Sequence, residues 1–132
     1  MKIAIIGTGN VGGALAGNWS KAGHEILLGV KDPQNFDNKH LLSNANTSVH
    51  TVTEAAQHAH VIVVATPPQI AEQLCSTFDN LDGKVIIDAT NSINTKPENY
   101  PTAFHAFEDL TNAHVVKSFN STGFENMTKP NY

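Results

Sequence analysis

Glycine is concentrated at one point of the sequence, in the stretch IIGTGNVGGALAG at residues 5–17. Three of these glycines have the spacing Gly7-x-Gly9-x-x-Gly12, directly after an apolar run and before a helical pattern. In that setting the first glycine permits a tight turn, the second lets a pyrophosphate approach the backbone, and the third lets helix and strand pack closely. The following helix would also direct free N–H groups and its positive dipole end at the anion. We therefore expect a dinucleotide site at this turn.

Two oppositely charged residues follow the second predicted strand, where the adenosine ribose of a dinucleotide is recognised. Lys31 would favour the 2'-phosphate of NADP, whereas the carboxylate of Asp32 would favour the ribose 2'-OH of NAD. Because the two residues are adjacent, at most one side chain can easily enter the ribose pocket before Pro33 turns the chain away. The residues alone leave both dinucleotides open.

The remaining reactive side chains do not indicate a catalytic centre. Among the seven histidines, His58 and His60 lie at a helix-to-strand junction without an acidic partner on one helical face, so no metal site is expected. Cys75, the single cysteine, is expected to be inert core filler or a solvated thiol. Asp88 ends an apolar strand and is either a partly buried carboxylate or a cap for the loop that follows.

These residues must be positioned by alternating strands and helices. Strands are predicted at residues 2–6, 25–30, 49–52, 60–66, 84–90 and 114–119. Helices are predicted at residues 11–22, 53–59, 67–78 and 102–112, with a helical turn near 38–43. Strands separated by helix-sized connections require right-handed crossovers and a parallel sheet. The expected fold is therefore α/β, a doubly wound parallel sheet of about six strands of the NAD(P)-binding Rossmann type, in one domain over residues 1–132.

The composition argues against several classes of partner. The 132 residues carry a formal net charge of -4 without any basic block, so we expect binding neither to nucleic acid nor to an anionic membrane. No stretch approaches membrane-spanning length, and the N-terminal run lacks the pattern of a signal peptide. A single cysteine suits a reducing compartment, so a cytoplasmic location is expected.

Four segments that cover nearly the whole chain carry a family resemblance. They are MKIAIIGTGNVGGALAGNWSKAGHEILLG, VIVVATPP, GKVIIDATNSI and VVKSFNSTG. Together they resemble the NADP-binding domain of the NADP-dependent reductases of coenzyme F420, a deazaflavin. That family also includes similar dinucleotide-binding enzymes and relatives of pyrroline-5-carboxylate reductase.

The resemblance implies a residue set on the pyrophosphate and adenosine side. Members that use NADP commonly carry Ser-Arg or Thr-Arg after a glycine where this chain has Val30 and Lys31. The cation is kept as a lysine, without the planar fork of arginine, so NADP is favoured and NAD is the alternative. The residues implied around the pyrophosphate are Thr8, Gly9, Asn10 and Val11, and the spacing adds Gly7 and Gly12 to the cofactor-binding turn.

On the nicotinamide side, the resemblance implies that Thr66, Pro67 and Pro68 form the loop beneath the nicotinamide ribose. Asn91 follows the fifth strand at the same rim, and Asn120 matches a position that borders the hydride-transfer pocket. All of these lie after strands, where open α/β sheets bind ligands. No catalytic acid or base is predicted.

The implied function is an NADP-dependent oxidoreductase that transfers hydride between NADP(H) and a deazaflavin, a flavin or a small-molecule partner. The alternative is a non-catalytic module that binds NAD(P)(H) or senses its redox state. Family members continue beyond FNSTGFENM with elements that complete the substrate pocket and often the dimer contact, so we expect either a truncated product or a minimal nucleotide-binding module. A sheet that lacks those neighbours would expose apolar surface, which predicts a homo-oligomer.

Overall fold

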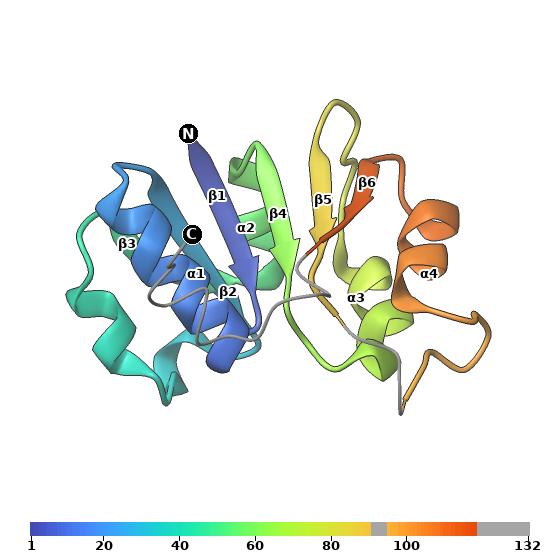
Figure 1. The fold of residues 1–132 in the computed structure, drawn as a ribbon, viewed down its shortest axis with the longest axis horizontal. Coiled ribbons are helices and arrows are strands. Elements are labelled where there is room, and N and C mark those ends of the chain that lie inside the picture. The colour runs from blue at the N-terminus through green and yellow to red at the C-terminus, as the bar shows by residue number, and fades with distance from the viewer. Residues whose placement is uncertain (91–94, 119–132) are drawn as a thin grey trace.

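The computed structural model describes residues 1–90 and 95–118, which form a parallel sheet with helices on both faces (Figure 1). Within these residues the sheet has six strands in the order β3-β2-β1-β4-β5-β6. The strands are β1 (Lys2–Ile6), β2 (Glu25–Val30), β3 (Thr47–Thr51), β4 (Val61–Val64), β5 (Val85–Asp88) and β6 (His114–Lys117). The strand order reverses between β1 and β4, and a doubly wound sheet binds its ligand outside the carboxyl ends at that point. The predicted fold class is confirmed.

The helices divide between the two faces because successive strand residues point to opposite sides. One face buries Ile3 and Ile5 against Leu15 of α1 and Leu41 of the 3-10 helix η2. The helical elements whose residues pack on that face are α1 (Asn10–Lys21) and η2 (Lys39–Ser43), and a short 3-10 turn η1 (Pro33–Asn35) precedes η2.

The second face of the sheet carries the other three helices. It buries Ala4 and Ile6 against the alanines of α2 and against Phe107 of α4, which is fully buried. These helices are α2 (Val52–His58), α3 (Ala71–Thr77), which follows the 3-10 turn η3 (Pro68–Ile70), and α4 (Ala103–Leu110). Gly29 allows the close approach of α2, since a Cβ there would lie 2.4 Å from Ile6 Cδ1 and 3.3 Å from Ala55 Cβ.

Several predicted boundaries were wrong at the carboxyl ends of the strands. Strands β4 and β5 end at residues 64 and 88, and β6 ends at 117, two residues before each predicted end. The helix expected over 67–78 is a 3-10 turn followed by a short α-helix, and Pro67 lies outside it with φ -56° and ψ 137°, because the proline that follows disfavours the helical conformation. The shorter strands leave more irregular backbone at the rim of the sheet.

The start of α2 also differs from the prediction. The predicted helix starts at residue 53, but the observed helix starts at Val52, and Thr51 caps it in a capping box with Glu54, whose backbone N–H donates to Thr51 Oγ1. The helix therefore begins directly after β3. Its first turn lies at the carboxyl end of the sheet, where β3 pairs with β2.

Candidate dinucleotide-binding site

The glycine turn between β1 and α1 uses its three glycines in different ways. Gly7 has φ +100°, and a Cβ there would lie 2.6 Å from the carbonyl oxygen of Ala65. A Cβ on Gly12 would lie 1.8 Å from the carbonyl oxygen of Gly7, so no side chain fits between helix and turn. A Cβ on Gly9 would meet nothing within 4 Å. The fold requires the outer two glycines, whereas Gly9 borders open space of the kind that an approaching pyrophosphate needs.

The N-terminus of α1 is free to hold an anion. Gly9 occupies the N-cap position and makes no side-chain cap hydrogen bond, and the first turn of the helix contains no acidic residue. Asn10 is exposed and Val11 is half-buried at this end of the helix. The N–H groups of the first turn and the positive end of the helix dipole can therefore serve a phosphate.

A cavity of about 680 Å³ opens beside the turn, at the carboxyl ends of β1 and β2. Gly7 and Thr8 line it from the turn, Val30 and Lys31 line it from the end of β2, and Thr66 lines it from the end of β4. The structure thus brings together five of the residues that the sequence predicts for dinucleotide binding. The cavity and the open space at Gly9 thus lie next to each other at this edge of the sheet.

The two charged residues after β2 have separate roles. Lys31 lines the cavity. The carboxylate of Asp32 instead accepts hydrogen bonds from Asn35 Nδ2 at 2.7 Å and from the backbone N–H of Gln34 at 3.1 Å. These bonds, first that of Asn35 and then that of Gln34, hold the pKa of the Asp32 carboxyl below its usual value. Asp32 caps η1 and does not line the cavity, so Lys31 is the charged residue of the two that lines it.

The proline loop, which the resemblance places beneath the nicotinamide ribose, lies mostly outside this cavity. Of Thr66, Pro67 and Pro68, only Thr66 lines the cavity. Pro67 is exposed, and Pro68 is buried at the start of η3. Asn91 and Asn120, implied for the nicotinamide side, lie outside the described residues.

The back wall of the cavity consists of residues that the sequence analysis missed. Val52 and Thr53 come from the start of α2, and Gln73 and Thr77 come from α3. Thr53 Oγ1 donates to the carbonyl oxygen of Thr77 at 2.9 Å, which braces the two helices against each other. No local pattern predicts this contact, because its partners are 24 residues apart and belong to separate helices. Only the Thr-x-x-Glu cap signature at 51–54 could have placed the start of α2 at this wall.

A buried charge cluster joins the carboxyl ends of β5 and β6. Asp88 is fully buried, and its Oδ1 accepts from the backbone N–H of Thr90 at 2.8 Å and from Thr90 Oγ1 at 2.6 Å. Its Oδ2 lies 3.4 Å from Lys117 Nζ, which also donates to the carbonyl oxygen of Thr90. Asp88 therefore combines both predicted roles, as a buried carboxylate and as a cap for the following loop.

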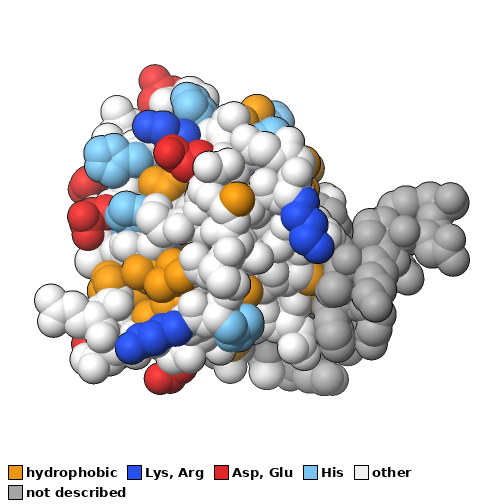
Figure 2. All heavy atoms as spheres, turned by 90° about the vertical axis from the view of Figure 1, so that its left-hand side faces the viewer, with side chains coloured by type: hydrophobic (Ala, Val, Ile, Leu, Met, Phe, Trp, Pro, Cys, Tyr) orange, Lys and Arg blue, Asp and Glu red, His pale blue; other side chains and the backbone are white. Residues whose placement is uncertain are grey.

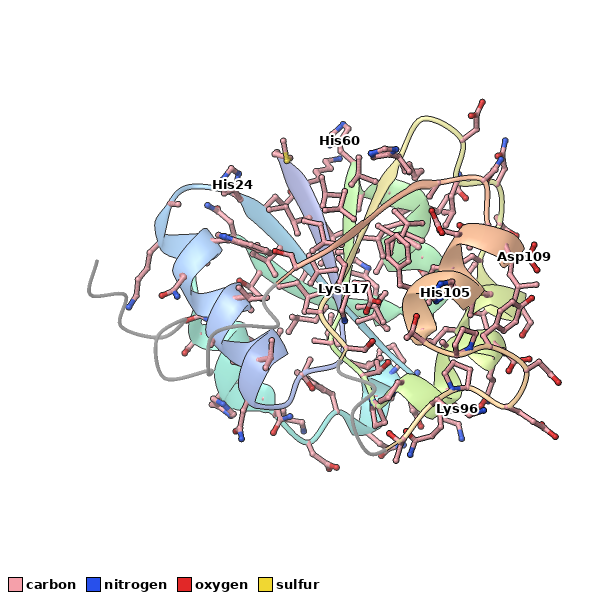
Figure 3. All side chains as sticks on the ribbon, turned by 45° about the vertical axis from the view of Figure 1, so that its right-hand side comes forward. His24, His60, Lys96, His105, Asp109 and Lys117 are labelled. Carbon is pink, nitrogen blue, oxygen red and sulfur yellow. The ribbon has the colours of Figure 1, made fainter. Side chains whose placement is uncertain are left out.

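Among residues 1–90 and 95–118, the titratable groups other than Lys31 do not line the cavity. Cys75 is buried on α3, and burial, with a smaller contribution from Glu72, raises the pKa of its thiol to about 11. Figure 3 shows His24 and His60 near the amino ends of the strands, far from Lys117. In the described part of the chain, no group of three or more His, Cys, Asp or Glu residues could hold a metal ion.

The surface and the helices add two further observations. Figure 2 shows the side of the molecule that carries β3, where acidic, basic and histidine side chains are interspersed without a large basic patch. No helix among the described residues is both long and apolar enough to cross a membrane.

Known structures share this architecture. A candidate F420-dependent NADP reductase from Arthrobacter sp. FB24 aligns with a TM-score of 0.81 and 25% identity, over 98% of this chain and 67% of that one. A hypothetical protein from Sinorhizobium meliloti aligns with a TM-score of 0.79 and 22% identity, over 97% of this chain and 65% of that one. A reductive aminase from Aspergillus terreus, in complex with NADPH and ethyl-5-oxohexanoate, shares the fold with a TM-score of 0.66 and 20% identity, over 88% and 38% of the two chains. This chain thus spans about two thirds of the first two proteins and much less of the third.

The family comparison agrees with the geometry of the turn and of Lys31. Residues 2–92 match the family model described as NADP oxidoreductase, coenzyme F420-dependent. The match confirms the predicted family and its cofactor, NADP. The chain belongs to the coenzyme F420-dependent NADP oxidoreductase family.

Proposed function

We propose that this chain binds NADP(H) along the carboxyl edge of β2, β1 and β4 and presents the nicotinamide for hydride transfer to or from a second redox partner. The observation that carries the proposal is the division of roles after β2. Lys31 faces the cavity, while Asp32 is bound to the turn that follows it. A cation at this point favours the 2'-phosphate that distinguishes NADP from NAD.

The adenosine half of the dinucleotide would occupy the cavity. Val52, Ile70 and Leu74 offer apolar surface for the adenine ring, and Lys31 would meet the 2'-phosphate at the end of β2. The pyrophosphate would lie over Gly9 and the N-terminus of α1, where space and N–H donors coincide.

The nicotinamide half would then extend across β4 toward β5. Thr66, Pro67 and Pro68 follow β4, and Asn91 and Asn120 are proposed for the same rim on the strength of the resemblance. When bound, NADPH supplies the hydride, so the chain has to orient the nicotinamide and its partner. The family resemblance favours a deazaflavin as the redox partner. A flavin and a small imine or carbonyl compound are the alternatives.

The first test is calorimetric titration of the 132-residue chain with NADPH and NADH. We expect Lys31→Ala to weaken NADPH binding by about tenfold or more, since it removes a charge-assisted contact to phosphate, and to leave NADH binding nearly unchanged. Lys21→Ala, at the opposite end of α1, is the matched control and should change neither affinity. Equal binding of the two dinucleotides by the unmodified chain, or binding of neither, would contradict the proposal.

Turnover distinguishes the enzyme from the alternative module. Mixing the NADPH-loaded chain with a deazaflavin or flavin acceptor should oxidise NADPH, which is followed by its absorbance. Binding without turnover for every acceptor would instead favour the redox-sensing module. The homo-oligomer also stays a prediction: Val116 on the edge strand β6 is 40% exposed, and sedimentation would show whether it is covered by a second copy.

A further inference from the structure

One asparagine reaches the glycine turn from a distant part of the chain. Asn38 Nδ2 lies 2.9 Å from the carbonyl oxygen of Thr8 and 3.1 Å from Thr8 Oγ1, although the residues are 30 positions apart. Thr8 belongs to the turn and lines the cavity. The contact therefore connects the phosphate-binding turn to the segment between β2 and β3, which begins with Lys31.

The chemistry of this contact has one consistent arrangement. A carbonyl oxygen only accepts hydrogen bonds, so the Asn38 atom beside Thr8 must be the NH2 group, which only donates. The Thr8 hydroxyl oxygen is then the acceptor for Asn38, and its own proton is left for another acceptor. Within the described residues, no hydrogen bond donated by Thr8 Oγ1 is formed.

The fold holds Asn38 in place from both sides. Phe36 and Leu41 are 6% and 7% exposed and anchor the segment in the core that α1 covers. Leu41 packs near the first turn of α1, where a Cβ on Gly13 would lie 3.7 Å from Leu41 Cδ2. Asn38 is the N-cap residue of η2, and its carbonyl oxygen accepts from the backbone N–H of Leu41. Its side chain thus extends from a packed support.

We propose that Asn38 is a positioning residue for the dinucleotide pyrophosphate: it occupies the acceptor side of the Thr8 hydroxyl, so that Thr8 donates its proton to a phosphate oxygen. The same two bonds also tie the segment that begins at Lys31 to the turn. This inference rests on the proposed function and adds a residue that neither the glycine pattern nor the resemblance indicates.

An aspartate at position 38 would reverse the arrangement. Asn38→Asp keeps the size of the side chain but removes the donor, accepts the Thr8 proton and adds negative charge beside the phosphates. We expect it to weaken NADPH binding more than Asn38→Ala, which only removes the donor. For Asn38→Ala the expected loss is about tenfold, the size of one hydrogen bond to a charged group.

The experiment compares two ligands, NADPH and adenosine 2'-monophosphate, on the 132-residue chain. The second ligand carries the 2'-phosphate but no pyrophosphate, so its affinity should stay within about twofold in both Asn38 variants. Asn38→Ala should also have a much smaller effect on NADPH in a Thr8→Val background, because the hydroxyl through which Asn38 acts on the phosphate is then absent and only the bond to the Thr8 carbonyl oxygen remains. Asn112→Ala removes an asparagine that bonds Leu81 and Asn80 far from the turn and is the control for lost stability.

Three results would overturn the inference while leaving NADPH binding by the unmodified chain intact. They are unchanged NADPH affinity in the Asn38 variants, equal weakening of both ligands, and an undiminished effect of Asn38→Ala in the Thr8→Val background. If the aspartate variant does not fold, Asn38→Ala and Thr8→Val still decide the outcome. Failure of the unmodified chain to bind NADPH would overturn the proposed function itself, and this inference with it.

Discussion

The carboxyl ends of the strands differ between the two halves of the sheet. On the β1 and β2 side, the rim opens into the cavity, and Lys31 lies at its edge; among the described residues it forms no ion pair. On the β5 and β6 side, the charged groups pair with each other, since Lys117 Nζ lies 3.4 Å from Oδ2 of the buried Asp88 carboxylate and donates to the carbonyl oxygen of Thr90. Both lysines follow or end a strand at the same edge.

This difference shows that a charge at the ligand edge of the sheet does not by itself mark a ligand. Removing a carboxylate such as Asp88 from water is costly unless a cation and hydrogen bonds compensate for it, so Lys117 is committed to the fold. Lys31 is exposed and pairs with no buried carboxylate among the described residues, so its charge is available to a phosphate. The two lysines therefore predict opposite patterns of stability and binding.

The largest effect is expected when the paired lysine is removed. Lys117→Met leaves Asp88 buried without its cation and should lower the free energy of unfolding by about 3 kcal/mol. Lys31→Met should change it by no more than about 0.5 kcal/mol. Urea denaturation measures the free energy of unfolding of both variants. Equal values for Lys117→Met and Lys31→Met would show that the ion pair between Lys117 and Asp88 does not stabilise the fold. Adding Asp88→Asn to Lys117→Met should recover part of the loss.

A smaller effect separates two glycines of the turn. Gly12→Ala forces a Cβ into the carbonyl group of Gly7 and should cost about 2 kcal/mol of stability. Gly9 has φ -75°, which alanine adopts freely, so Gly9→Ala should leave the melting temperature nearly unchanged while weakening NADPH binding. Thermal unfolding with and without NADPH would test both expectations. A stability loss at Gly9 as large as that at Gly12 would contradict the division between fold and ligand.

The smallest effect concerns α2, which links β3 to β4 across the two halves. Hydrogen bonds from Thr51, first that of its side chain and then that of its backbone, lower the pKa of Glu54. A lowered pKa means that Glu54 contributes stability above its unfolded pKa and loses it as the pH falls through the folded value. Glu54→Gln should therefore melt below the unmodified chain at pH 7, and the two should converge below about pH 4.

The control for this comparison is Glu108→Gln on the exposed surface of α4. It should follow the unmodified chain at both pH values. A difference between Glu54→Gln and the unmodified chain that persists at low pH would show that the glutamate acts through packing and not through its charge.

Much of the architecture could be predicted because it follows from local patterns. The apolar runs predicted all six strands. The alternation of strands and helices predicted that the strands are parallel, since each helix returns the chain to the sheet by a right-handed crossover. The strand ends and the start of α2 were less accurate. At the rim, proline chemistry and the cap at Thr51 decide where each element begins, and hydrophobic periodicity carries little information there.

The site was predictable in part for the same reason. The glycine spacing predicts Gly7 and the resemblance implies Thr8, Val30, Lys31 and Thr66, and these five residues line one cavity. The sequence alone did not show which of Lys31 and Asp32 lies at the ligand site. The answer depends on the turn at 33–35, whose Gln34 and Asn35 donate hydrogen bonds to the Asp32 carboxylate. Nor could the sequence find Thr53, Thr77 or Asn38, whose partners are 24 to 30 residues away.

By itself, the sequence determined the doubly wound sheet, the glycine turn and the family to which the chain belongs, because spacing and hydrophobic period report on backbone geometry over a few residues. Only the tertiary structure decided which charges are free. Lys31 is available to a ligand and Lys117 is not. A lysine's role depends on the carboxylates and carbonyl groups that folding brings within a few ångströms, and the positions of those groups along the sequence do not reveal which of them will be neighbours.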